Sequence, residues 1–256
     1  MAESADSLLP GAWPEIVRKI RARTPARLLA GRAGAAYRTA TQLDLREAHA
    51  AARDAVRDEL DFEKFGSDFI TRWQLFAVSS AATSKGEYLL QPNLGRTLSP
   101  SARAELQKLC PPRRDLQIVI GDGLSVTAVL AQVPRLLPAL CEGAETRGWT
   151  LGQPFVIRHC RVGILNDIGE FLLPSVAILL IGERPGLATA ESLSAYMAYG
   201  PNKNHTDADR NLISNIHARG VGPRDAALRI LNLAAQMMKA KFSGAQLREE
   251  SHPKQK

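Results

Sequence analysis

The fold is decided by Leu116-Gln-Ile-Val-Ile120 and by the Gly121-Asp-Gly-Leu-Ser125 turn that follows it. A second apolar run, Val176-Ala-Ile-Leu-Leu-Ile181, ends in the same way at Gly182-Glu-Arg-Pro-Gly186. Short apolar runs that stop at glycine turns are typical of strands buried on both faces of a parallel sheet. Each run is followed by a carboxylate, and ligands of open parallel sheets bind outside the carboxyl ends of the strands. The two turns therefore predict a site for a polar ligand.

The residues on either side of these runs alternate between patterns typical of helices and of strands. A helix is expected after the first run, and Pro134 and Pro138 predict a kink or a break in it. Alternation of this kind favours an α/β fold whose parallel strands are joined by right-handed crossovers. The expected elements are a strand over 115–121, a helix over 125–147, a strand over 155–159, a helix over about 163–172, a strand over 175–182, short strands over 192–199 and 208–218, and a helix over 228–241.

The residues before this pattern favour helices. Pro14 is expected to open a short helix that ends near Arg23, and Thr41 is a suitable N-cap for a long helix over 42–60. The stiff segment Pro111-Pro-Arg-Arg114 is the best domain boundary in the chain. The predicted organisation is a flexible leader over 1–13, a mainly helical N-terminal domain over 14–110, a linker over 111–114, an α/β domain over 115–248 and a tail over 249–256.

Composition places the chain among ordinary soluble proteins. Of its 256 residues, 45% are hydrophobic and 23% are charged, and no apolar run approaches the ~20 residues that a membrane helix needs. The first residues lack the basic flank and apolar core of a secretory signal, so we expect a cytoplasmic protein with no membrane partner. Cys110, Cys141 and Cys160 are odd in number and far apart, which favours reduced thiols in the core over disulfides or zinc ligands.

The net charge of +7 is concentrated near the N-terminus. Between Val17 and Leu43 there are seven basic residues and no acidic one, a pattern suited to a nucleic acid, an anionic ligand or an acidic protein surface. Tyr37 is the only aromatic residue in that stretch, and base-reading motifs are absent from the sequence. A basic nucleic-acid-binding module therefore remains an alternative, but we do not expect nucleic acid as a partner.

The turns at the strand ends do not match the familiar phosphate-binding or hydrolase motifs. Gly121 and Gly123 lack the third glycine of a dinucleotide-binding turn, and no Gly-Lys-Ser/Thr or Gly-x-Ser-x-Gly sequence is present. Asp122 and Ser125 either cap the following helix or face a ligand. The histidines are scattered without metal-ligand spacing, so no metal ligands and no catalytic set are assigned. A ligand crevice without a catalytic set fits a subunit whose partner supplies the chemistry.

A set of short motifs, taken in order, resembles the small (light) subunit of ethanolamine ammonia-lyase. The resemblance covers nearly the whole chain, from about Arg23 to about Gly244. The motifs are Gly31-Arg-Ala-Gly34, Asp122-Gly-Leu-Ser125, Arg161-Val162, Ile168-Gly-Glu170, Leu180-Ile-Gly-Glu-Arg-Pro-Gly186, Glu191-Ser-Leu-Ser194, Ala208-Asp-Arg210 and Ile213-Ser-Asn-Ile-His217.

The resemblance implies an adenosylcobalamin-dependent lyase that converts ethanolamine to acetaldehyde and ammonia by radical chemistry. It further implies a Rossmann-like C-terminal domain, a large partner subunit that carries the substrate site, and a hetero-oligomer with several copies of each subunit. The small subunit would help to enclose the cobalamin, and the complex would lie in the cytoplasm, either free or within a bacterial microcompartment. A stand-alone Rossmann-like enzyme that uses a nucleotide is the other alternative.

The same resemblance assigns cobalamin contacts to Val162, Glu183 and Leu212. Leu212 stands where other members can carry cysteine. A corrin ring is fringed with amide side chains, so a carboxylate such as Glu183 can accept their N–H groups, while Leu212 can cover corrin carbon. The chain lacks the Asp-x-His-x-x-Gly signature of cobalamin enzymes in which a histidine replaces the nucleotide base on cobalt. As far as this subunit is concerned, the base is therefore expected to stay on the metal.

Overall fold

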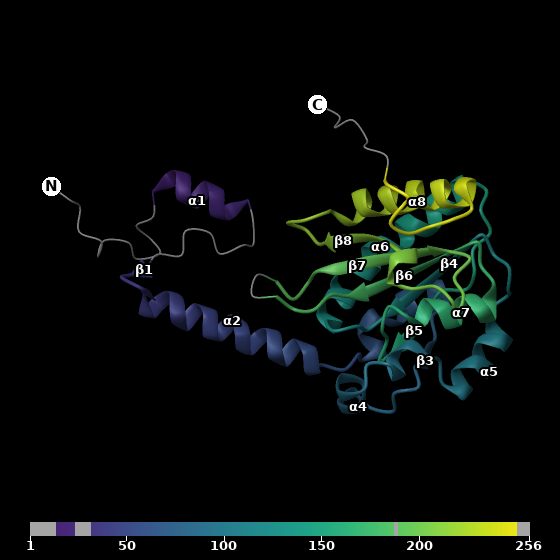
Figure 1. The fold of residues 1–256 in the computed structure, drawn as a ribbon, viewed down its shortest axis with the longest axis horizontal. Coiled ribbons are helices and arrows are strands. Elements are labelled where there is room, and N and C mark those ends of the chain that lie inside the picture. The colour runs from purple at the N-terminus through teal and green to yellow at the C-terminus, as the bar shows by residue number, and fades with distance from the viewer. Residues whose placement is uncertain (1–13, 24–31, 187–188, 250–256) are drawn as a thin grey trace.

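The two apolar runs lie side by side at the centre of a six-stranded sheet in the computed structural model, which describes residues 14–23, 32–186 and 189–249 (Figure 1). They form β4 (Leu116–Gly121) and β6 (Val176–Gly182), which pair in parallel. The sheet order is β3-β5-β4-β6-β7-β8. The other strands of this sheet are β3 (Ala77–Ser79), β5 (Phe155–Arg158), β7 (Leu193–Tyr199) and β8 (Asn211–Ile216).

The α/β class is confirmed, but the sheet is mixed rather than parallel. β3, β5, β4 and β6 run in parallel, whereas β7 is antiparallel to β6 and β8 is antiparallel to β7. The strands expected over 192–199 and 208–218 are present with shorter bounds. Their direction could not be predicted because apolar alternation defines which face a residue occupies and contains no information about strand polarity.

Helices cover both faces of the sheet. Ile118 and Ile120 belong to one core cluster with α6 (Val126–Thr146) and α8 (Pro223–Ala240), whereas Val119 belongs to a second cluster with α5 (Pro100–Leu109) and α7 (Ile164–Leu172). Successive strand residues thus alternate between two buried layers, which explains why the two runs are apolar except at Gln117, a buried side chain whose amide donates to two backbone carbonyls. Each large aliphatic side chain buried in this way contributes about 1.5–3 kcal/mol of transfer free energy.

The helix after β4 passes through both of its prolines without interruption. Ser125 is its N-cap and accepts the Ala128 N–H at 3.2 Å, which confirms the capping interpretation of this serine. The break expected at Pro134 and Pro138 is absent, since a single helix spans both. Each proline removes one helical hydrogen bond, but the fully buried side chains of Val133, Leu136, Leu137 and Leu140 on the same helix offset that loss.

Two other helices begin earlier than expected. The long N-terminal helix, α2 (Thr39–Arg57), starts after Arg38, which makes no side-chain capping bond, so Thr41 is not its N-cap. The last helix, α8, starts at Pro223 rather than at 228, because proline fits the first helical turn, where its missing N–H costs nothing. The remaining elements are α1 (Glu15–Ala22), β1 (Arg32–Ala33), β2 (Ala36–Tyr37), α3 (Ser67–Trp73) and α4 (Lys85–Leu90), with short 3₁₀ turns at Phe62–Phe65, Leu94–Arg96 and Asp207–Asp209.

The segment before 111–114 contains α1 to α5 and also contributes a strand to the sheet. Ala77 of β3 pairs with Val156 of β5, so both sides of the expected linker share one sheet. The division into two domains at 111–114 stays a prediction. The expected leader over 1–13 and residues 250–256 of the expected tail lie outside the described residues. None of the described helices combines the length and the apolarity needed to span a membrane.

All three cysteines are buried free thiols, as predicted. Burial raises the pKa of Cys110 and of Cys141 from 9.0 to about 12, and it also raises the pKa of Cys160. We expect dithionitrobenzoate to leave them unmodified at pH 8 in the native protein and to label all three in denaturant. Fast labelling of the native protein would contradict this burial.

Burial also makes the stability depend on pH. Because the folded pKa values of these thiols are raised, their contribution to the free energy of unfolding is complete below pH 9 and declines between pH 9 and about 12.

Candidate functional site

A pocket of about 280 Å³ lies at the carboxyl ends of the central strands. Its walls come from the turns after β4 and β6, from the loop between β5 and α7, and from one face of β7 and β8. We call it the sheet-edge pocket. β5 and β6 lie on the two sides of β4. The chain reaches β5 through α6 and β6 through α7, and these two helices cover opposite faces of the sheet. Such switch points are where open α/β sheets place their ligands.

The three residues assigned to cobalamin by resemblance all line this pocket. Val162 comes from the turn before α7, Glu183 directly follows β6, and Leu212 lies on β8. Val162 and Glu183 are half-buried, whereas the Leu212 side chain, on the edge strand β8, is 46% exposed. The fold thus brings together three residues from distant parts of the sequence around one cavity.

Glu183 is held in place by a β-bulge in β8, which lies beyond β7 from the strand that Glu183 follows. Ser214 and Asn215 of β8 together oppose Ser194 of β7, so one backbone N–H of β8 is left outside the ladder. That N–H, from Asn215, donates to Glu183 Oε1 at 2.9 Å, and the Ser194 hydroxyl donates to the same oxygen at 2.7 Å. Among the described residues, none donates a hydrogen bond to Glu183 Oε2. The bulge therefore fixes the carboxylate and leaves one oxygen for a ligand.

The bulge is itself fixed by a histidine. The Arg219 N–H donates to His217 Nδ1 at 3.2 Å, so Nδ1 carries no proton. The other ring nitrogen, Nε2, then donates to Asn215 Oδ1 at 2.7 Å. Asn215 has a left-handed backbone with φ of 61°, which asparagine tolerates better than most residues. These contacts explain the motif Ser214-Asn-Ile-His217 as a device that orients Glu183.

Replacing Asn215 tests this role of the bulge. Asn215→Ala should lower the free energy of unfolding by about 1–2 kcal/mol, because alanine is strained at positive φ and lacks the amide that His217 binds. Asn215→Gly removes the same amide without strain and should cost less. Urea unfolding of the two variants measures the difference, and equal losses would show that the left-handed backbone carries no strain.

Asp122, the other acid expected at the strand ends, faces the interior. It is 1% exposed, and its two carboxylate oxygens accept the N–H groups of His159 and Cys160, each at 2.8 Å. The prediction of a ligand-facing carboxylate is therefore wrong for Asp122, which ties the end of β5 to the end of β4. His159, which has a positive φ of 56°, is likewise structural, and its Nδ1 lies 3.2 Å from the Ala82 carbonyl oxygen.

A buried lysine accompanies Asp122. Lys85 is 5% exposed, and its ammonium donates to the carbonyl of Gly123, which lines the pocket, at 3.2 Å. Burial lowers the pKa of Lys85, and the nearby charge of Asp122 acts in the opposite direction. Burial raises the pKa of Asp122, which the Lys85 charge and the two N–H donors oppose. Asp122 and Lys85 thus shape the turn after β4 from beneath the pocket.

Sequence reasoning missed the aromatic wall of the pocket. Tyr88 of α4 is fully buried and donates its hydroxyl to the Cys160 carbonyl at 3.1 Å, while the Arg161 guanidinium lies 4.3 Å from the centre of its ring. Tyr196 of β7 also lines the pocket. The alternation in β7 could have placed Tyr196 beside Ser194. Nothing in the sequence near Tyr88 indicates that it meets the end of a strand.

The pocket combines apolar surface with hydrogen-bonding groups at its margin. Val162 and Leu212 supply aliphatic carbon, and Glu183 supplies an acceptor. Arg161 lines the pocket with guanidinium N–H donors, and its buried Nε has no hydrogen-bond partner among the described residues. Such a set fits the edge of a flat apolar ring that carries amide groups. The cavity is far smaller than a cobalamin, so it would hold only one margin of the cofactor.

The family model and the similar proteins found by comparison all point to one family. The family model described as "Ethanolamine ammonia-lyase light chain (EutC)" matches residues 14–248. Three proteins named ethanolamine ammonia-lyase small subunit are similar to this chain. The one from Clostridium perfringens is 40% identical over 91% of this chain and 78% of its own length. The one from Clostridium acetobutylicum is 39% identical over 91% and 95%, and the one from Clostridioides difficile is 41% identical over 90% and 76%.

The family model covers the α/β body and the three candidate cofactor contacts, Val162, Glu183 and Leu212. Identity near 40% over nine-tenths of the chain is far above the level at which a shared fold alone would explain it. The resemblance stated from the motifs is therefore confirmed. The chain belongs to the ethanolamine ammonia-lyase light chain family.

Proposed function

We propose that this chain is the small subunit of an adenosylcobalamin-dependent ethanolamine ammonia-lyase and that its Rossmann-like body holds one edge of the cobalamin. The observation that carries the proposal is the gathering of Val162, Glu183 and Leu212 around the sheet-edge pocket. The enzyme would convert ethanolamine to acetaldehyde and ammonia. The substrate would bind to the large subunit, in a hetero-oligomer with several copies of each chain. We place this complex in the cytoplasm, within a microcompartment where the host cell builds one.

The residues of the pocket suit the margin of a corrin. Glu183 Oε2 would accept an amide N–H of the ring, and Arg161 would donate to an amide oxygen. Leu212 and Val162 would cover ring carbon and remove it from water. The bulge that fixes Glu183 means that little side-chain freedom is lost when the ligand binds.

The chemical role of this subunit would be positional. Bound adenosylcobalamin supplies a weak cobalt–carbon bond whose cleavage provides the radical for the reaction. The residues described above would fix the ring against the large subunit and keep water from its edge. Asp122 and Lys85 would act only by supporting the turn after β4.

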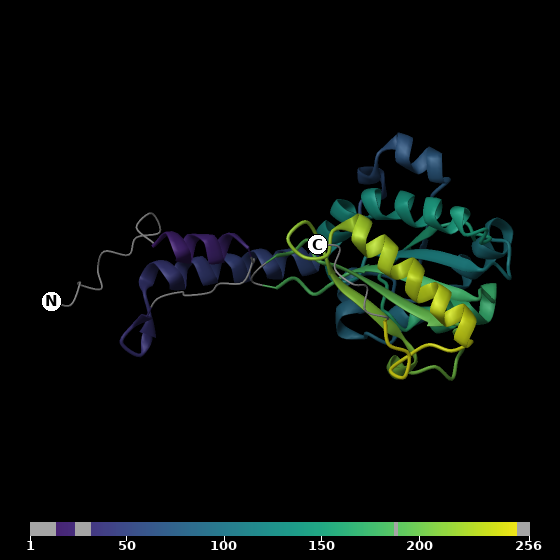
Figure 2. The ribbon, with the colours of Figure 1, turned by 90° about the horizontal axis from the view of Figure 1, so that it is seen from above.

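The helical arm at the N-terminus suits a docking role. Helices α1 and α2 project away from the sheet and its covering helices in both views (Figures 1 and 2). Apart from Ala55, no residue of these two helices is buried, although Ile16, Ile20 and Leu43 are large and apolar. An exposed apolar and basic arm of this kind is expected to be covered by a partner, and we propose the large subunit.

Co-expression tests the proposed function. The chain is expressed with a large subunit, the complex is purified and loaded with adenosylcobalamin, and the absorption spectrum is recorded after gel filtration. We expect the cofactor spectrum to travel with a complex that contains both chains and that releases acetaldehyde from ethanolamine. A complex that forms but retains no cobalamin would refute the cofactor role, and failure of the two chains to associate would refute the subunit role.

A further inference from the structure

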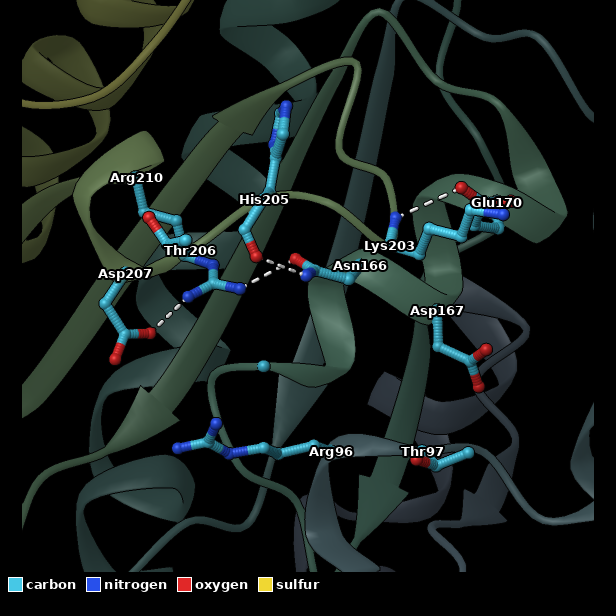
Figure 3. Close-up of a pocket in the computed structure, with 11 residues that line it drawn as sticks. Arg96, Thr97, Asn166, Asp167, Glu170, Lys203, His205, Thr206, Asp207 and Arg210 are labelled. Carbon is cyan, nitrogen blue, oxygen red and sulfur yellow. Dashed lines mark hydrogen bonds and ion pairs between the residues drawn. The ribbon is translucent and has the colours of Figure 1, made fainter. Parts of the chain in front are cut away.

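A second pocket has a volume of about 470 Å³, and its lining residues are drawn in Figure 3. It is bounded by α7, by the loop that holds Arg96 and by the loop over 203–210. We call it the α7 pocket. The two pockets share a wall, because Val162 lines one and Gly163 the other, and because Arg210 of the α7 pocket lies two residues before Leu212 of the sheet-edge pocket.

The acidic residues of the α7 pocket already have partners. Asp167 accepts from the Arg103 guanidinium at 2.9 Å and from the Leu98 N–H at 2.7 Å. Glu170 accepts the Lys203 N–H at 3.1 Å. Asp207 forms an ion pair with Arg210. These carboxylates therefore do not make the pocket a cation site.

Two guanidinium groups lie at one end of the pocket with space between them. Figure 3 shows the Arg96 and Arg210 side chains on the same side of the pocket, away from Asp167 and Glu170. The aliphatic stem of Arg96 packs against Gly163, where a Cβ would lie 2.9 Å from Arg96 Cγ. Among the described residues, the Arg96 guanidinium has no hydrogen-bond or ion-pair partner.

Arg210 is held rigidly. Its side chain is 4% exposed, Nη1 pairs with Asp207, and Nη2 donates to Asn166 Oδ1 at 2.7 Å. Its Nε is buried and has no hydrogen-bond partner among the described residues. Burial lowers the pKa of Arg210, the ion pair and hydrogen bond with Asp207 oppose that effect, and the nearby charge of Arg96 adds to it. One carboxylate pairs with Arg210, and no described carboxylate pairs with Arg96.

We propose that Arg96 and Arg210 bind a phosphate-class oxyanion between them, which is the phosphodiester of the nucleotide tail when cobalamin occupies the adjoining pocket. The planar fork of the Arg96 guanidinium matches the oxygen spacing of a phosphate and binds it more strongly than a neutral donor can. Arg210, whose Nη atoms already bind Asp207 and Asn166, would add its positive charge and its remaining N–H groups. Cobalamin carries one phosphodiester, on a tail attached to the edge of the corrin. The part of this inference that concerns the cofactor rests on the proposed function.

The test uses the complex of this chain with a large subunit and compares cobinamide, which has no phosphate, with cobinamide phosphate. Equilibrium dialysis should show at least 10-fold tighter binding of cobinamide phosphate. In Arg96→Gln this preference should fall to near unity, whereas Arg96→Lys should retain part of it. Lys239→Gln removes an equal charge from the exposed end of α8 and should leave the preference unchanged.

Inorganic phosphate is the second probe, detected by phosphorus NMR on the same complex. Phosphate binding that is lost in Arg96→Gln while the two corrinoids bind equally would support the oxyanion site and identify free phosphate as its source. If the complex binds no corrinoid, the proposed function fails, and the phosphate titration still reports on the α7 pocket. If neither probe depends on Arg96, the oxyanion site is refuted.

Discussion

Asp122→Ala is expected to lower the free energy of unfolding by about 2–6 kcal/mol. The change removes the acceptor of two buried N–H groups, those of His159 and Cys160, and each unsatisfied group costs about 1–3 kcal/mol. It also leaves the buried charge of Lys85 without its nearby carboxylate. Urea unfolding of the full chain, followed by circular dichroism, measures the loss.

Asp122→Asn provides the matched control. Asparagine keeps one acceptor oxygen and turns an N–H donor toward the second backbone N–H, so it should lose roughly half as much as alanine. Both variants should expose the Cys160 thiol to labelling more readily than the parent. A loss below about 1 kcal/mol for Asp122→Ala would show that these hydrogen bonds do not support the end of β5.

Glu183→Ala is expected to weaken cobalamin binding by the assembled complex about 10- to 100-fold. The carboxylate would lose a charge-assisted hydrogen bond to a ring amide, and such bonds contribute about 1.5–3 kcal/mol. Glu183→Gln retains an oxygen for Asn215 and Ser194 and should lose less affinity. Equilibrium dialysis with cyanocobalamin measures both, independently of turnover.

The control for Glu183→Ala is Glu142→Ala, which removes an equal charge from an exposed position on α6 outside the pocket. We expect this variant to bind cobalamin as the parent does and the Glu183 variants to remain folded. If Glu183→Ala retains the parent affinity, Glu183 is not part of the cofactor site. If it fails to assemble with the large subunit, Glu183→Gln still separates affinity from folding.

The sequence predicts the centre of this fold better than its margins. The runs that became β4 and β6 are apolar at every position but Gln117 because both faces are covered, and that pattern is local. The direction of β7 and the inclusion of β3 in the sheet depend on contacts between distant segments, which no local pattern encodes. Proline at 223 is typical of a first helical turn and would indicate where α8 starts, but the apolar face that predicts the helix begins only at Leu228.

The candidate site shows the same division. The family resemblance predicts Val162, Glu183 and Leu212 as cofactor contacts, and the fold gathers all three around one pocket. Residue type alone does not distinguish Asp122 from Glu183, because both are acids at the end of a strand. They differ because Asp122 precedes a helix and meets the end of β5, whereas Glu183 meets a bulge that leaves one oxygen open. The bulge is formed by β8, far along the chain, so the distinction requires the structure.

An electron cryo-microscopy map of the complex with the large subunit and bound adenosylcobalamin would test directly whether the sheet-edge pocket holds the cofactor. We predict that the corrin margin lies in the sheet-edge pocket, with a ring amide within hydrogen-bond distance of Glu183 and ring carbon against Val162 and Leu212. A map in which the cofactor is bound elsewhere and this pocket opens to solvent would contradict the role proposed for this subunit.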